Sequence, residues 1–447
     1  MENSRFFLLI LALAPIISSV LFDDIYSLSS IWFVCIVLYL AVDLIYDRKV
    51  KLVHAWLGVL VYSTISEGMV NYLRLEQMEY GLESVKYTST ANAVFLIGYT
   101  FSYKSLPQNE VSVAAESESI DAVPYYVAQV VAIVFYLVFG SFAANAFFKG
   151  RLAATQFEEE SSFLFIASIM GILSSTYFAL IMQKRTKRRF LRTLCFTNVL
   201  AISLMMGAGG TRFLCVYAML PLLLSGFNYL QVNLKLSTFF GLFTGSMLGL
   251  FFLKLIRQFR GIGLSEASIS FSSPTTTNPR FFEQIGHQFS VEGVLKVTAY
   301  IHDYTERNGF GEGQAAIFLF QMWIPRFIWP EKPTMLTYWI AREYESGFGT
   351  GHSVSAGLFG FLRYDFGPWA YLFALLIGYL LVKLELFVDL RRRKHTVAVC
   401  LLFPTVLFFV RSPITAVFYF CLIYGLHLIV AAVLSVYRPS FSHGDHR

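Results

Sequence analysis

Charged residues are scarce in this chain, and their scarcity excludes a single water-soluble globular domain. Only 14% of the 447 residues are Asp, Glu, Lys or Arg, whereas 56% are hydrophobic. One aqueous core cannot bury that much apolar surface, so lipid must solvate a large part of it. The composition therefore predicts an all-α polytopic membrane protein, because helices satisfy their own backbone hydrogen bonds in lipid.

Cysteine is also rare, and its positions fit neither a disulfide framework nor a metal site. The five cysteines all lie inside apolar runs, without paired spacing and without a histidine cluster nearby. They are Cys35, Cys195, Cys215, Cys400 and Cys421. We expect them to be small core residues, and we expect no bound metal and no cofactor.

A cleavable leader and a nucleic-acid surface are likewise not indicated. The first apolar run lacks a basic n-region and a small-residue cleavage site, which is typical of a retained span. The formal net charge of +6 is explained by cations that anchor the cytoplasmic side of a membrane protein. We therefore expect membrane lipids as partners and no nucleic acid.

What the sequence does contain is a series of apolar runs long enough to cross a hydrocarbon core of about 30 Å. We count twelve, at about 6–22, 28–46, 52–72, 89–103, 125–147, 161–183, 193–208, 213–229, 236–255, 367–388, 396–411 and 413–435. Basic clusters follow the second, sixth and tenth runs, at 47–51, 184–192 and 391–395. Since lysine and arginine concentrate on the cytoplasmic side, both termini are predicted inside.

This threading divides the chain into four parts. Residues 1–255 hold nine spans, 256–366 form a long outer loop, 367–437 hold three spans, and 438–447 form a cytoplasmic tail. Within the loop, apolar residues recur at helical spacing over 280–307, which predicts an amphipathic helix on the membrane surface. The stretch 314–330 is apolar, Trp-rich and broken by proline, which predicts a short interfacial helix.

Arginines recur at the predicted outer ends of spans. Arg212 lies in the glycine turn GAGGTRF, Arg257 and Arg260 share a helical face, and Arg411 ends a span in VRSPIT. A cation at such a boundary is costly and usually faces a cavity or a partner. The alternative for each is that it snorkels to lipid headgroups.

Three stretches together resemble the Wzy-type oligosaccharide repeat-unit polymerases of bacterial surface polysaccharides. They are GGTR (209–212), IPRFIWPEKP (324–333) and GTGHSVSAGLFGFLRYDFGPWA (349–370). The long outer loop ahead of the last three spans matches that family as well. The resemblance implies metal-independent glycosyl transfer on the periplasmic face of the bacterial inner membrane. The donor would be a growing glycan on undecaprenyl pyrophosphate, and the acceptor a new lipid-linked repeat.

That chemistry needs cations for the departing pyrophosphate and a base for the acceptor hydroxyl. For the pyrophosphate we predict Arg212, Arg257, Arg260 and Arg411, followed by Arg326 and Arg363. For the base we predict His352 in GTGHS, with Asp303 and Asp365 as alternatives. A hydrogen bond to backbone is the alternative for His352, and we expect no catalytic role for His302.

Other functions stay open at this point. An O-antigen ligase would use the same donor with a lipid A core acceptor, and a flippase or other transporter would move lipid-linked sugars without breaking bonds. A structural assembly partner would need none of these arginines. We find no internal repeat, which a transporter with inverted repeats would show. A polymerase would also have a chain-length regulator as a further expected partner.

Overall fold

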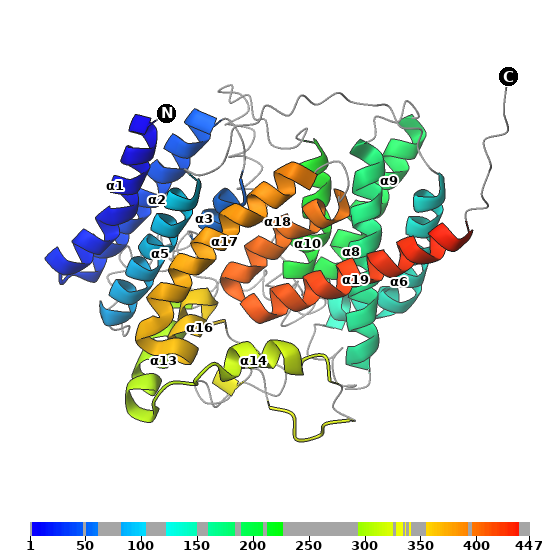
Figure 1. Ribbon diagram of the computed structural model, residues 1–447. Coiled ribbons are helices and arrows are strands. Elements are labelled where there is room, and N and C mark those ends of the chain that lie inside the picture. Colours follow the sequence, from blue (N-terminus) through cyan, green and yellow to red (C-terminus); the bar gives the residue numbers. More distant parts are fainter. Residues whose placement is uncertain are drawn as a thin grey trace, which may run out of the picture.

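The computed structural model describes most of the predicted spans and part of the outer loop. The described residues are 2–47, 51–60, 82–103, 122–149, 160–183, 189–208, 212–226, 294–324, 328–333, 336, 339–340, 355–391 and 396–437. Every regular element in these ranges is a helix, which confirms the all-α prediction (Figure 1). The longer elements are α1 (Glu2–Leu21), α2 (Ile25–Asp47), α3 (Leu52–Leu60), α5 (Leu82–Tyr103), α6 (Ala122–Lys149), α8 (Glu160–Gln183), α9 (Arg189–Ala208), α10 (Arg212–Gly226), α13 (Val294–Asn308), α14 (Gln314–Gln321), α16 (Gly357–Phe366), α17 (Ala370–Arg391), α18 (Thr396–Arg411) and α19 (Pro413–Tyr437).

Several of these helices have the length and composition of membrane spans. Within the described ranges, five segments are long and apolar enough to cross a bilayer. They are Ser27–Leu44, Tyr125–Phe148, Arg189–Ala208, Gly357–Leu386 and Pro413–Val433. The prediction of a membrane protein is thus supported, while the count of twelve spans and their orientation stay predictions.

The apolar helices pack in two groups that share α18. One buried cluster joins α1, α2, α3, α5 and α17, and a second joins α6, α8, α9, α10 and α19. Residues of α18 enter both, because its two sides face different groups. In the first group Trp56 stacks on Phe95 with ring centroids 4.1 Å apart.

The contact between α5 and α17 is unusually close because each helix places a glycine against the backbone of the other. A Cβ atom at Gly98 would overlap the carbonyl oxygen of Leu375, and one at Gly378 would overlap that of Phe95. Small residues at a helix contact allow the backbones to approach, as in many membrane helix pairs. These two helices therefore form one tightly fitted unit.

A third group of helices lies across one end of the two bundles, in the lower part of Figure 1. We call α13, α14, α16 and residues 336, 339 and 340 the outer layer, because the sequence predicts this part of the chain on the outer side of the membrane. The predicted amphipathic helix over 280–307 is present from Val294, the part before it lying outside the described residues. Its apolar residues Val297 and Ile301 are buried against the rest of the outer layer, with exposures of 1% and 0%. This face is thus covered by protein, where the sequence predicts contact with lipid.

Candidate functional site

The outer layer is organised around α16, the helix of the LFGFLRYDF stretch. The hydroxyl of Tyr87 in α5 donates to the carbonyl of Phe359, 2.9 Å away. The Thr298 hydroxyl of α13 donates to the carbonyl of Ala356 at 3.2 Å. The Ser355 hydroxyl donates to the backbone carbonyl of Arg411 at the end of α18. Because α5, α13 and α18 all hold it, α16 offers a rigid support for its side chains.

Arg363 of α16 is a partly buried cation that aromatic rings enclose. Its guanidinium carbon lies 5.6 Å from the ring centroids of both Tyr87 and Phe310. Rings at this distance attract the cation without neutralising it. The Nε atom is buried and has no hydrogen-bond partner, and no carboxylate of the described residues lies within ion-pair distance of the side chain. Arg363 is therefore oriented and retains donors that suit a phosphate oxygen.

His302 of α13 lies beside this cation, a pairing that no pattern in the sequence predicts. Nη2 of Arg363 donates to Nε2 of His302 across 3.4 Å, and Nδ1 of His302 lies 3.2 Å from Oε1 of Glu306. Since a guanidinium only donates, Nε2 must accept, and the ring proton belongs on Nδ1, facing Glu306. The contact between His302 and Glu306 could have been predicted from their i,i+4 spacing, which places both side chains on one helical face.

Asp365, an alternative for the base, holds the start of α14. Its two carboxylate oxygens accept the backbone N–H groups of Ala315 and Ala316, at 2.9 and 2.7 Å. The side chain is 2% exposed. A carboxylate at this position satisfies otherwise unpaired N–H groups and interacts favourably with the helix dipole. These contacts give Asp365 a structural role, and its role as a base stays a prediction.

The other end of α14 is held by a cation of the IPRFIWPEKP stretch. The Lys332 ammonium donates to the carbonyls of Met322 and Ile324, at 3.2 and 3.0 Å, and lies 5.7 Å from the ring centroid of Phe318. Carbonyls that follow a helix lack intrahelical partners, and a lysine here satisfies two of them. One of the two cations in this stretch thus stabilises the local fold. The other, Arg326, lies outside the described residues.

The remaining predicted site residues divide into those that the structure describes and those that it does not. Arg411 is partly buried at the end of α18, and Asp303 is exposed on α13 beside His302. Arg212 begins α10, and its side chain lies outside the description, as do Arg257, Arg260 and His352.

A hydrogen bond joins α10 and α18 near the ends that carry Arg212 and Arg411. The hydroxyls of Tyr217 and Thr405 hydrogen-bond between these helices. Arg212 precedes Tyr217 by five residues and Arg411 follows Thr405 by six, so each backbone lies within about two helical turns of this contact.

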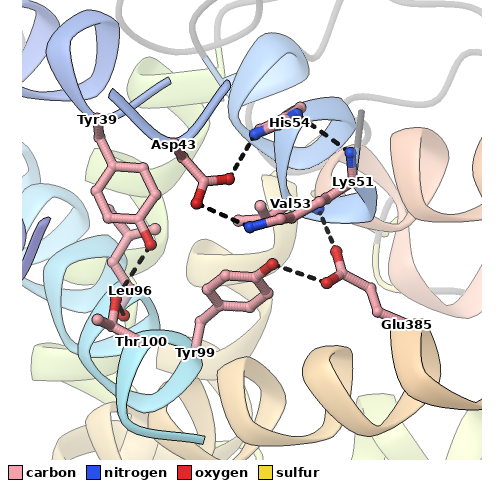
Figure 2. Close-up of polar contacts among 9 residues, drawn as sticks. All are labelled: Tyr39, Asp43, Lys51, Val53, His54, Leu96, Tyr99, Thr100 and Glu385. Atoms are coloured by element: carbon pink, nitrogen blue, oxygen red, sulfur yellow. Dashed lines mark hydrogen bonds and ion pairs between the residues drawn. The ribbon is translucent and has the colours of Figure 1, made fainter. Parts of the chain in front are cut away.

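A second polar cluster lies far from Arg363. Figure 2 shows Asp43 accepting from the Lys51 ammonium at 2.8 Å and from Nε2 of His54 at 2.7 Å. Glu385 of α17 accepts from the Val53 N–H at 3.0 Å and from the Tyr99 hydroxyl at 2.7 Å. This network joins the end of α2 and the start of α3 to α5 and α17. Glu385 lies 15 residues beyond the start of α17, about 22 Å along the helix and away from α16.

No protein family, curated protein or solved structure matches this chain. Among the residues that the structure describes, no group of three or more His, Cys, Asp or Glu side chains could hold a metal ion. A functional proposal therefore rests on the motifs and on the geometry around Arg363.

Proposed function

We propose that this protein is a membrane glycosyltransferase that polymerises lipid-linked oligosaccharide repeats at the outer face of a bacterial inner membrane. The observation that supports it best is Arg363. This arginine lies in one of the three stretches that resemble the repeat-unit polymerases, and aromatic rings orient it. No carboxylate of the described residues neutralises it. An arginine in that state suits an anionic ligand such as pyrophosphate.

The proposed reaction transfers the growing glycan from one lipid carrier to the next repeat. An acceptor hydroxyl oxygen attacks the anomeric carbon of the donor, and the bond from that carbon to the pyrophosphate oxygen breaks. The electron pair leaves with the lipid pyrophosphate, which gains one negative charge. The hydroxyl proton passes to a base, for which His352 is the first candidate and Asp303 and Asp365 are the alternatives.

Arginines supply the stabilisation of the departing charge. Arg363 would contact the pyrophosphate, together with Arg411 and the other predicted cations Arg212, Arg257, Arg260 and Arg326. Fixed donors aimed at a developing anion are often the largest single contribution to catalysis. Such donors require no metal ion and no nucleotide cofactor.

The test is an extension assay with purified protein in lipid, given the lipid-linked repeat as both donor and acceptor. We expect Arg363→Ala to lower the rate by about a hundredfold or more, the usual cost of removing one such donor. Arg363→Lys should recover little of the extension rate, because an ammonium group cannot reproduce the planar set of donors of a guanidinium. Arg307→Ala is the matched control, since Arg307 is exposed on α13 in the same layer. A wild-type rate for Arg363→Ala would contradict the role of Arg363, and no extension by the wild-type protein would contradict the proposed function.

A deletion strain separates the alternatives. Surface polysaccharide with a single repeat on lipid A identifies a polymerase, whereas free lipid-linked polymer identifies a ligase. Loss of every outer repeat identifies a flippase. The gel thus tests the reaction class without depending on any one residue.

A further inference from the structure

Three aromatic side chains meet on the side of α16 next to Arg363. Tyr304 of α13 and Trp339 have ring centroids 4.8 Å apart in an edge-on arrangement. Tyr364 of α16 lies 5.9 Å from Trp339 and 6.4 Å from Tyr304. We call these three residues the aromatic patch. Its rings come from three separate segments of the outer layer, so the fold assembles the patch.

The backbone is shaped to receive one of these rings. Gly311 donates its N–H to the carbonyl of Tyr364 at 2.8 Å, and a Cβ atom at Gly311 would overlap the Tyr364 ring. Trp339 and Tyr364 pack against a buried cluster that contains Ile340 and Phe361. One side of the patch is therefore packed against the core of the outer layer.

Within the part of the chain that the structure describes, the polar ends of the patch have no hydrogen-bond partner. The hydroxyls of Tyr304 and Tyr364 and the indole N–H of Trp339 make no hydrogen bond to any other described residue, and all three side chains are partly exposed. Buried tyrosine and tryptophan usually find a partner for these groups. Here the donors remain available to a ligand, beside rings that offer an apolar surface.

We infer that the aromatic patch binds a sugar ring of the oligosaccharide. The C–H face of a pyranose fits an aromatic ring, and its hydroxyls match free O–H and N–H donors. Sites for small polar ligands commonly combine aromatic walls with a few placed polar groups. The identity of the sugar ligand rests on the proposed function.

The position of the patch relative to Arg363 fits a ligand that carries both a sugar and a phosphate. Tyr364 directly follows Arg363 in α16, and Tyr304 comes two residues after His302 in α13. In a lipid-linked repeat the pyrophosphate is joined directly to the first sugar. A cation and a sugar platform on adjacent faces of one helix would bind these two parts together, and binding energy from the sugar would orient the reacting carbon.

The experiment measures binding of a sugar that has neither lipid nor phosphate. The probe is the free oligosaccharide repeat, released by mild hydrolysis from the surface polysaccharide of the source cells. The full chain is held in lipid nanodiscs, and affinity is measured by saturation-transfer NMR. We expect Tyr364→Leu to weaken binding about tenfold or more, because it removes the ring and the hydroxyl. Tyr364→Phe keeps the ring packed on Gly311 and should lose only the part of the affinity that is due to the hydroxyl. Tyr126→Leu, an aromatic that is 65% exposed on α6, is the control and should bind normally.

Each outcome decides between the patch and its alternatives. Normal sugar binding by Tyr364→Leu overturns the inference, as does a wild-type protein that does not bind the oligosaccharide. A variant that inserts poorly into lipid but binds sugar normally would identify the patch as a membrane anchor, which also overturns it. Sugar binding by the wild type, combined with no extension of the lipid-linked repeat by the wild type, would leave the patch standing and refute the proposed function instead.

Discussion

Replacing Asp365 by alanine distinguishes a structural carboxylate from a catalytic one. In the structure both of its oxygens accept backbone N–H groups at the start of α14, from Ala315 and Ala316. The variant removes both acceptors while leaving the peptide bonds in place. Because the carboxylate is 2% exposed, water cannot easily replace it. The first turn of α14 should therefore open more often.

The size of this effect follows from the two hydrogen bonds. A hydrogen bond to a charged group contributes roughly 1.5 kcal/mol net, so two contribute about 3 kcal/mol to the closed state of this turn. Since about 1.4 kcal/mol corresponds to a tenfold change in an equilibrium constant, the open population should rise more than a hundredfold. Loss of the favourable charge at the helix N-terminus adds to this.

Hydrogen exchange of the peptide over 314–321 measures this opening directly, because local opening sets the exchange rate of its amides. Asp303→Ala is the matched control, since Asp303 is exposed on the neighbouring α13 and should leave the exchange unchanged. Unchanged exchange in Asp365→Ala would refute the structural reasoning. If that variant also lost all glycosyl transfer, Asp365 would be the base instead.

Two further predictions concern stability, and both are measured as thermal unfolding in detergent. Gly378→Val forces a side chain into the α5 backbone and should destabilise the protein by about 3 kcal/mol or more, whereas Gly425→Val, where nothing lies within 4 Å of a Cβ atom, should have little effect. Lys51→Met leaves the buried Asp43 carboxylate without its ammonium and should cost about 3 kcal/mol. Lys86→Met also removes one partner of an ion pair, but the carboxylate of Asp23 that remains is 87% exposed to water. The midpoint of thermal unfolding should therefore hardly move. Equal losses in the Lys51 and Lys86 variants, or in the two glycine variants, would contradict these expectations.

The class of the protein could be read from its sequence because helix formation in lipid depends mainly on the length and polarity of a run. The predicted runs at 28–46, 125–147 and 413–435 coincide closely with α2, α6 and α19. The predicted ends of the helices were less accurate where a helix continues past its apolar run. The run at 89–103 lies inside α5, which begins at Leu82 because its first turns pack in the outer layer, where Tyr87 binds α16.

Contacts between distant residues could not be read in this way. The spacing of α13 shows which of its faces is apolar, but not whether lipid or protein covers that face. Arg363 and His302 are 61 residues apart, and Tyr99 and Glu385 are 286 apart. Only the packing of α16 and α17 against their neighbours brings these pairs together. Neither the contact of Asp43 with His54 nor that of Glu385 with Tyr99 follows from the spacing of the apolar runs.

The fit of α5 against α17 has a mechanical consequence. At one end of this pair Tyr87 binds the carbonyl of Phe359, and at the other Tyr99 binds Glu385. Twelve residues, about 18 Å of helix, separate the two tyrosines. Between them the glycine contacts leave no room for the helices to slide past one another. The two helices therefore move as one body, and a shift of α16 that moved them would also disturb the contact of Glu385 with Val53 at the other end of the pair.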